Sequence, residues 1–182
     1  MIIRRALLSD ARSIRDLAQE LTIPRKSCVP NGLEGFVVPD VDGWKARIEG
    51  NKYFFVADTD RVSGFLACYT REHLRRFAAQ DEVKRALLDD REVMAYLELL
   101  GVDRKYRRTG VANALEERLE EELYHDGFTH FHGIIAHAPL RNEASIRLHL
   151  KRGATLVREL SAYDGMVFGV YQKTIAAAKL RE

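Results

Sequence analysis

The sequence has few of the features that mark secreted, membrane-bound or nucleic-acid-binding proteins. Two cysteines, Cys28 and Cys68, are too few for a disulfide framework or a cysteine-rich zinc site. No apolar run could span a bilayer, and residues 1–5 are not followed by a signal-peptide core. The 29 basic residues nearly balance 27 acidic ones, without a long basic block. These absences predict a cytoplasmic protein with neither a membrane nor a nucleic acid as partner.

Apolar material is sufficient for a packed core. Hydrophobic residues make up 46% of the 182 residues, and this length predicts one domain over residues 1–182. The order of strand and helix patterns predicts an α/β protein, a mixed sheet with helices packed on it. The predicted elements are a strand at 2–6, a helix opening at Ser9 and Asp10, a loop over 22–43, strands at 53–57 and 64–69, a helical insert over 73–88, a strand at 93–102, a helix from 111, a strand at 128–136, a helix at 142–152, and paired strands at 154–160 and 166–172.

Two of these segments have more than one interpretation. The loop over 22–43 is rich in proline and glycine and is either a substrate-binding flap or a surface loop tucked onto the core. The insert over 73–88 is either a lid or dimer contact, or an ordinary amphipathic surface helix.

The stretch from Val93 to Leu123 predicts an anion-binding site. An almost continuous apolar run up to Val102 indicates a buried strand, and a basic loop follows from Arg104 to Gly110. An amphipathic helix comes next, with apolar residues at every fourth position. Because a helix start offers free N–H groups and a positive dipole end, this arrangement favours a phosphate group. The apolar helix residues are Val111, Leu115, Leu119 and Leu123.

Two common nucleotide-binding motifs are absent from this stretch. A Walker A loop requires G-x-x-x-x-G-K-[ST], which the sequence lacks. A dinucleotide fingerprint requires G-x-G-x-x-G, and Gly101 and Gly110 are too far apart for it. Both motifs are thus absent at the place where they would be needed.

The loop carries the pattern [QR]-x-x-G-x-[GA], which resembles the acetyl-coenzyme A motif of the GNAT acetyltransferase superfamily. The resemblance implies that the loop amides hold the pyrophosphate of the cofactor. Gly110 would let the backbone turn close to the anion, and Ala112 would keep the helix start uncrowded. The residues of the pattern are Arg107, Arg108, Thr109, Gly110, Val111 and Ala112.

The resemblance extends over most of the chain. The opening strand with its arginine and the nearby Asp10 resemble the start of the family's domain, and residues 142–154 resemble its N-x-x-A-x-x-L-Y-x-K-x-G-F segment. His149 stands where the family usually has tyrosine, and Ala154 where it usually has phenylalanine. The GNAT fold, a predominantly antiparallel sheet flanked by helices, and acetyl-CoA as co-substrate are what the resemblance implies.

Residues Asn142, Ser145 and His149 form a polar stripe along the predicted helix. A polar stripe within an apolar arc has to find partners or line a cleft. His149 is either a hydrogen-bonded core histidine or, as the resemblance suggests, the general acid for the cofactor thiolate. Asn142 and Ser145 are expected on the cofactor side of the same helix.

Glu98 is the expected general base because it is a lone carboxylate in an otherwise apolar strand. Burial there would raise its pKa towards the useful range, and the base could act through water. The alternative is a structural ion pair or a strand-end carboxylate. The resemblance implies that the backbone of Leu100 and Val102 pairs with the cofactor's amides, with Gly101 marking a β-bulge.

The sequence thus predicts an N-acetyltransferase that uses acetyl-CoA and an unidentified primary amine. The alternative is a non-catalytic acyl-CoA-binding or regulatory module of the same fold. No metal is expected, because His130 and His132 lack a third ligand at a convincing spacing. The resemblance also suggests a homodimer, and the acceptor is not encoded in a recognisable pattern.

Overall fold

The structure, a computed structural model of the whole chain, describes residues 1–23, 33–34, 38–139, 141–163 and 165–175. Its contacts divide the chain into two compact units, which are described one at a time. Unit 1 comprises residues 1–25, 32–68 and 98–122, and unit 2 comprises residues 26–31, 69–97 and 123–182. None of the helices in the described ranges is long and apolar enough to cross a membrane.

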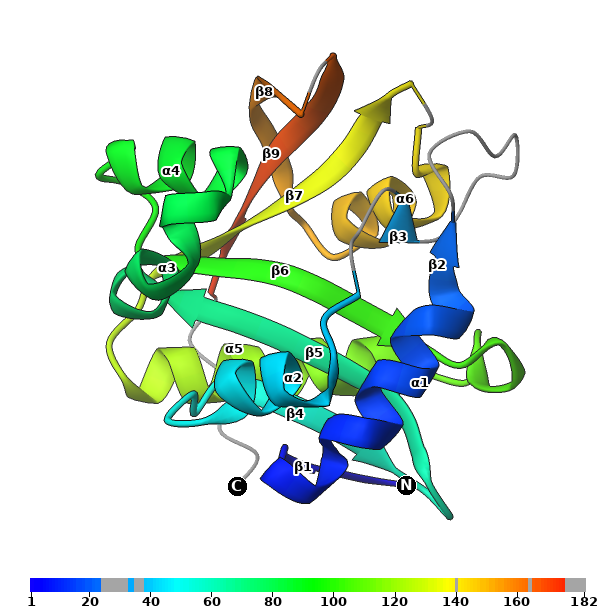
Figure 1. Cartoon of the computed structure of the whole chain (residues 1–182). Coiled ribbons are helices and arrows are strands. Elements are labelled where there is room, and N and C mark those ends of the chain that lie inside the picture. Colours follow the sequence, from blue (N-terminus) through cyan, green and yellow to red (C-terminus); the bar gives the residue numbers. More distant parts are fainter. Residues whose placement is uncertain (24–32, 35–37, 140, 164, 176–182) are drawn as a thin grey trace. The chain divides into compact units, whose positions relative to one another are not determined.

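The strands form a mixed, seven-stranded sheet in the order β1-β4-β5-β6-β7-β9-β8 (Figure 1). Antiparallel pairs join β1 to β4, β4 to β5, β7 to β9 and β8 to β9, whereas β6 and β7 run parallel. A parallel pair needs a crossover connection, which α5 supplies. This confirms the predicted mixed sheet. The strands are β1 Ile2–Arg5, β4 Phe54–Asp58, β5 Val62–Thr70, β6 Ala95–Val102, β7 His130–Ala138, β8 Thr155–Ala162 and β9 Met166–Thr174, with a separate short pair of β2 Thr22–Ile23 and β3 Leu33–Glu34.

In unit 1, helices cover both faces of the strands. Helices α1 (Ala11–Leu21) and α2 (Val41–Ile48) lie beside each other on one face, and α5 (Val111–His125) lies on the other (Figure 1). Gly64 of β5 lets α5 approach closely, because a Cβ there would come within 2.8 Å of a Val111 methyl group. The predicted apolar stripe of α5 is buried along its whole length, which confirms that prediction: Val111, Leu115, Leu119 and Leu123 are at most 2% exposed.

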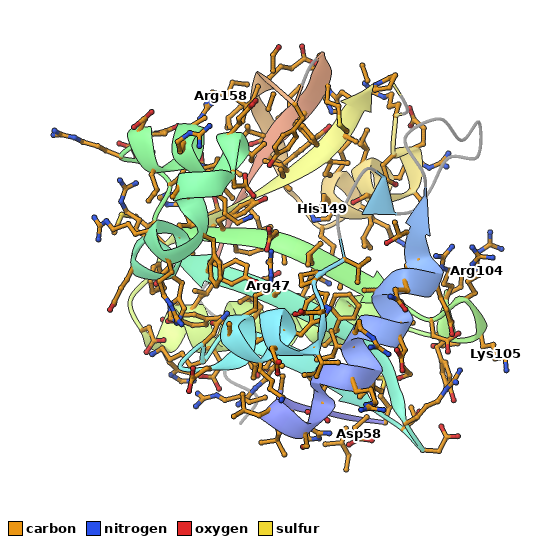
Figure 2. The ribbon with its side chains drawn as sticks, in the orientation of Figure 1. Arg47, Asp58, Arg104, Lys105, His149 and Arg158 are labelled. Carbon is orange, nitrogen blue, oxygen red and sulfur yellow. The ribbon has the colours of Figure 1, made fainter. Side chains whose placement is uncertain are left out.

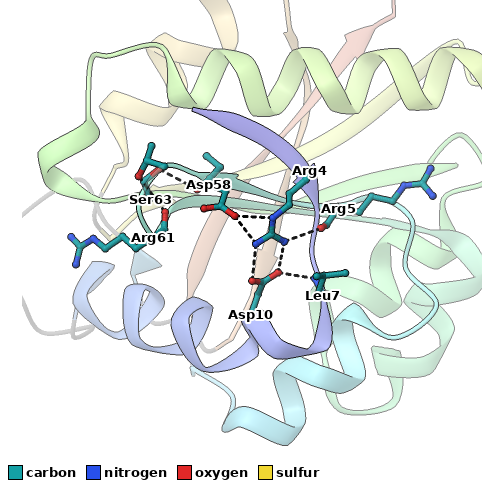
Figure 3. A network of polar contacts seen from close by, with 9 residues as sticks. Arg4, Arg5, Leu7, Asp10, Asp58, Arg61 and Ser63 are labelled. Carbon is teal, nitrogen blue, oxygen red and sulfur yellow. Dashed lines mark hydrogen bonds and ion pairs between the residues drawn. The ribbon is translucent and has the colours of Figure 1, made fainter.

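An arginine joins the first strand, the first helix and β4 (Figure 3). The Arg4 guanidinium donates to both carboxylate oxygens of Asp10, at 2.7 and 3.0 Å, and to Asp58 at 2.9 Å. Burial opposes ionisation of Asp10, but the Arg4 guanidinium and the Leu7 amide outweigh it and lower the Asp10 pKa. Asp10 therefore stands at the start of α1, as predicted, with its carboxylate bound to Arg4.

In unit 2, the predicted insert over 73–88 is two helices instead of one. These are α3 (Arg71–Phe77), followed by the 3₁₀ turn η2 (Ala78–Gln80), and α4 (Glu82–Asp89). Asp81 separates them and caps α4, because its carboxylate accepts from the Lys84 amide at 3.0 Å. The Tyr163 hydroxyl donates to the same carboxylate at 2.6 Å, so α4 is joined to the β8–β9 connection.

The predicted ends of two helices are confirmed. Gly127 follows α5 with φ of +82°, and Gly153 follows α6 (Glu143–Lys151) with φ of +83°. Glycine adopts this left-handed conformation without the penalty that a Cβ imposes, and it ends helices for that reason.

The prediction of a loop over 22–43 is wrong at its end, where α2 begins at Val41. Asp40 caps the helix by accepting from the Gly43 amide at 2.7 Å, and Trp44 and Ile48 face the core. This eight-residue helix was not predicted, because Gly43 in its first turn suggests a loop. The flap proposed for this segment falls mainly on residues 24–32 and 35–37, outside the described residues.

Candidate functional site

The loop between β6 and α5 is held at its start by a buried aspartate. The Asp103 carboxylate accepts from the Lys105 amide at 2.9 Å and begins a 3₁₀ turn, η3 (Arg104–Tyr106). Asp103 also forms an ion pair with Arg61, and its amide donates to the Ser63 carbonyl at 2.9 Å. The predicted order of strand, basic loop and helix is confirmed.

A second contact with the β4–β5 turn holds the middle of the loop. The Tyr106 hydroxyl donates to Asp60 at 3.0 Å, and the Thr109 hydroxyl donates to the Tyr106 carbonyl at 2.7 Å. Hydrogen bonds from the Thr59 hydroxyl, the Asp60 amide and Tyr106 lower the Asp60 pKa. The sequence analysis missed Asp60, Arg61 and Asp103; the available signal was an acidic residue between a buried strand and a basic run.

The backbone of the loop turns sharply just before α5. Arg108 has φ of +65° and Gly110 has φ of +93°. A residue with a Cβ pays about 1–2 kcal/mol for this conformation, so Arg108 is held against its preference. The Ala114 amide donates to the Gly110 carbonyl at 3.0 Å, which makes the amides of residues 111–113 the free first turn of α5. Nothing lies within 4 Å of the position a Gly110 Cβ would occupy, so the backbone is open there.

The basic side chains of the loop surround this turn on the surface. Arg104, Lys105, Arg107 and Arg108 are all exposed, and Figure 2 shows Arg104 and Lys105 projecting from the loop. Partial burial and the charge of Arg104 lower the pKa of Arg107, as expected for cations gathered close together. Four cations beside a helix N-terminus suit a phosphate-bearing ligand.

Glu98 is engaged in a buried ion pair, a partner the sequence analysis missed. An Nη1 hydrogen of Arg47 on α2 is donated to Glu98 Oε2 at 2.5 Å, and the two side chains are 13% and 8% exposed. Glu98 therefore has an ion-pair partner, and a cation in contact with the carboxylate favours its ionised form. Leu100 and Val102, further along β6, are half-buried.

The contacts of Gly101 point to an irregularity in β6. A Cβ at Gly101 would lie 2.6 Å from the Phe65 ring and 3.0 Å from Leu21 of α1. Phe65 packs edge-on against Trp44 of α2, so Gly101 and Glu98 both face the helices α1 and α2. Residues three apart on a regular strand face opposite sides, and a β-bulge between them reverses this. A bulge at Gly101 would account for these contacts and stays a prediction.

The polar stripe of α6 lies in unit 2. Asn142 caps the helix, its side-chain oxygen accepting from the Ser145 amide at 3.1 Å. His149 is 7% exposed, and its Nδ1 lies 2.8 Å from the Ser145 carbonyl oxygen and 3.5 Å from the Ser145 hydroxyl. A carbonyl oxygen only accepts, so Nδ1 carries a hydrogen. The neutral imidazole consequently presents a lone pair at Nε2, which points towards Gly133 of β7.

The histidine pair on β7 has a different character. The Nε2 of His130 donates to the Glu92 carbonyl at 3.0 Å, and its Nδ1 lies 3.0 Å from the Thr129 hydroxyl. His132 is 3% exposed, and burial together with the charge of His130 lowers its pKa to about 4. Within the described ranges, no group of three or more histidine, cysteine, aspartate and glutamate side chains is placed to hold a metal ion.

The predicted site residues are divided between the two units. Unit 1 contains the base candidate, the end of β6 and the basic loop before α5, and unit 2 contains the polar stripe of α6. In unit 1 these residues are Glu98, Leu100, Val102, Arg107, Arg108, Thr109, Gly110, Val111 and Ala112; in unit 2 they are Asn142, Ser145 and His149.

Comparison with known proteins matches the chain to a family model. Residues 18–154 match the model of the family described as "Acetyltransferase (GNAT) family". No curated protein matches the chain.

Solved structures share the fold. Ard1 from Thermoplasma volcanium is 18% identical with a TM-score of 0.65, covering 96% of this chain and 97% of that one. The yncA protein from Salmonella typhimurium, solved with its cofactor acetyl-CoA, is 18% identical with a TM-score of 0.64, covering 97% and 94%. The ribosomal-protein-S18-alanine N-acetyltransferase from Escherichia coli is 15% identical with a TM-score of 0.63, covering 100% and 97%. At these identities the likeness establishes the fold, which confirms the predicted architecture.

Proposed function

Because the chain belongs to the acetyltransferase (GNAT) family, we propose that it transfers the acetyl group of acetyl-CoA directly to a primary amine. The observation that carries this proposal is the turn at Arg108 and Gly110. It leads a basic loop into the free amides of the first turn of α5. Members of this family use acetyl-CoA, and a pyrophosphate is the kind of anion that such a loop recognises.

The residues of the loop fit that anion by their chemistry. The open backbone at Gly110 and the amides of Val111 and Ala112 would receive the pyrophosphate, with Arg107, Arg108 and Thr109 around it. The backbone of Leu100 and Val102 would pair with the amides of the pantetheine arm. Asn142 and Ser145 remain predicted cofactor contacts, supported by the family pattern in which they stand.

Transfer of an acetyl group to an amine requires the removal of a proton from the amine and stabilisation of the departing thiolate. Glu98 would accept the first proton, directly or through a water molecule, as its ionised form allows. His149 would donate to the thiolate. Because its Nδ1 hydrogen is bonded to the Ser145 carbonyl, His149 can donate through Nε2 when it is an imidazolium.

One observation favours the alternative of a non-catalytic acyl-CoA-binding or regulatory module. In its neutral form His149 has a lone pair at Nε2, where a tyrosine would offer an O–H donor. A protein of this kind would bind CoA tightly without turnover.

Thiol release from acetyl-CoA, measured with a thiol-reactive dye, separates the two functions. The amine panel should contain spermidine, lysine, benzylamine and a peptide with an N-terminal alanine, the last suggested by the name of one structural neighbour. Turnover with any of these amines supports the enzyme. Tight CoA binding with no turnover on the whole panel supports the binding module.

Glu98→Gln tests the base. The variant should lose most activity below pH 8, where the amine is mainly protonated and has to be deprotonated during catalysis. Glu121→Gln is a matched control, because Glu121 is half-exposed on α5 and pairs with Arg118 at 3.5 Å. An unaltered pH profile in Glu98→Gln would remove Glu98 from the mechanism.

A further inference from the structure

The ion pair between Arg47 and Glu98 is a buried pair formed across 51 positions of the chain within unit 1. Arg47 rises from α2 towards the strand that carries Glu98 (Figure 2). The two side chains are 13% and 8% exposed, so water screens little of their interaction. Breaking such a pair by removing one partner leaves an uncompensated charge that is largely shielded from water.

Arg47 also contacts an aromatic ring of its own helix. Its guanidinium carbon lies 5.8 Å from the centre of the Trp44 ring, within the range of a cation–π contact. Trp44 is fully buried, with its ring edge-on to Phe54 at 6.2 Å and to Phe65 at 5.7 Å. The arginine is thus in contact with a buried aromatic side chain of the core.

The other basic residue in the last turn of α2 has none of these features. Lys45 is 48% exposed and pairs with Asp42 three residues earlier, and the Asp42 side chain is 86% exposed. Exposed pairs of this kind contribute little to stability. Two cations of the same helix therefore differ in burial and partner, which makes Lys45 a matched control for Arg47.

A general base in a buried strand has two requirements, to be ionised when the amine arrives and to point in one direction. Burial alone works against the first, because it favours the neutral acid. A cation in contact restores the ionised form, and a hydrogen bond to one oxygen fixes the carboxylate orientation.

We propose that Arg47 is the positioning residue of the base: its guanidinium keeps the Glu98 carboxylate ionised and fixes its orientation for the incoming amine. This inference rests on the proposed function of Glu98. It adds α2 to the catalytic apparatus, through a residue that acts on the base and not on the acetyl group.

Three single variants test the proposal, Arg47→Met, Arg47→Lys and Lys45→Met. Thiol release from acetyl-CoA is measured with the amine of the panel above that gives the fastest rate. Arg47→Met should lower kcat by about tenfold to a hundredfold, part of the effect of a general base, while KM for acetyl-CoA stays within about twofold. Arg47→Lys should recover most of the lost kcat because the charge remains, and Lys45→Met should match the wild type.

A second measurement does not depend on turnover. The side-chain carboxyl carbon of Glu98, assigned by its absence in Glu98→Gln, is followed by NMR during a pH titration. Its midpoint should move to higher pH in Arg47→Met and return towards the wild-type value in Arg47→Lys. If Arg47→Met does not fold, Arg47→Lys and Lys45→Met still allow the comparison, because a lysine that fails to support either kcat or the titration would contradict the role of the charge.

The outcomes separate the two proposals. If the wild type is active and kcat of Arg47→Met lies within about twofold of the wild-type kcat, the proposed acetyltransferase function is unaffected and the role of Arg47 is overturned. An unmoved Glu98 titration in Arg47→Met overturns it as well. If the wild type releases no thiol with any amine of the panel, the proposed function is overturned, and with it the role of Glu98 as the base that Arg47 would position.

Discussion

Replacing Gly110 separates the two properties of the phosphate loop, its backbone turn and its charge. Gly110 has φ of +93°, and the space at its Cβ position is open. A Cβ at this position therefore meets conformational strain of about 1–2 kcal/mol without a steric clash. Gly110→Ala and Gly110→Gln should share that strain, and Gly110→Glu should add only a negative charge to it.

The charge effect can be bounded from Coulomb's law. A carboxylate about 4 Å from a phosphate is repelled by about 1 kcal/mol in bulk water and by about 4 kcal/mol at the effective dielectric of a protein surface. At 1.4 kcal/mol per factor of ten, CoA affinity should fall between about fivefold and a thousandfold from Gly110→Gln to Gly110→Glu. The difference should shrink as salt is added, because the loop is exposed.

Isothermal titration calorimetry with CoA at low and high salt, on variants shown by circular dichroism to be folded, measures these affinities. Equal CoA affinities of Gly110→Gln and Gly110→Glu at low salt would refute the assignment of this loop to the cofactor phosphates. A large loss in Gly110→Ala alone would show that the turn matters more than the charge.

Three further changes test other parts of the structure. Gly101→Ala should destabilise the fold by about 1–3 kcal/mol in urea unfolding, since its Cβ would meet the Phe65 ring at 2.6 Å; an unchanged midpoint would contradict the packing. Folding keeps His132 neutral, because burial and the His130 charge lower its pKa to about 4, whereas the unfolded imidazole takes up a proton below about pH 6.5. The free energy of unfolding should therefore fall as the pH drops from about 6.5 towards 4, and it should fall less in His132→Phe than in the wild type. Equal losses of stability in the two proteins over this pH range would refute the role of His132. Asp103→Asn removes the charge paired with Arg61 and should weaken CoA binding by roughly tenfold in calorimetry, which is part of the strength of a charged hydrogen bond. A wild-type CoA affinity in this variant would contradict the inference that the ion pair positions the loop.

The parts of the fold that could be predicted are those encoded locally. The apolar stripe of α5, the Asn142 cap and the glycines that end α5 and α6 each follow from residues within one or two turns. The order of strand, basic loop and helix between Ala95 and His125 follows from local patterns for the same reason.

Long-range partners could not be predicted. The pair of Arg47 with Glu98 joins residues 51 positions apart, and that of Arg61 with Asp103 joins residues 42 apart. No periodicity encodes such distances, because they depend on how the strands and helices pack. The sequence analysis also missed α2, the helix that carries Arg47. Because that helix was not predicted, the partner of Glu98 could not be predicted either.

The contacts between the β4–β5 turn and the phosphate loop have a consequence for engineering the protein. A hairpin turn of a few exposed residues would ordinarily be chosen for a tag, a linker or a shortened connection. Here Asp60 and Arg61 hold Tyr106 and Asp103, so a graft at that turn would also alter the loop proposed to bind the cofactor. Insertions in this hairpin should be read as changes to cofactor affinity before they are read as changes to stability.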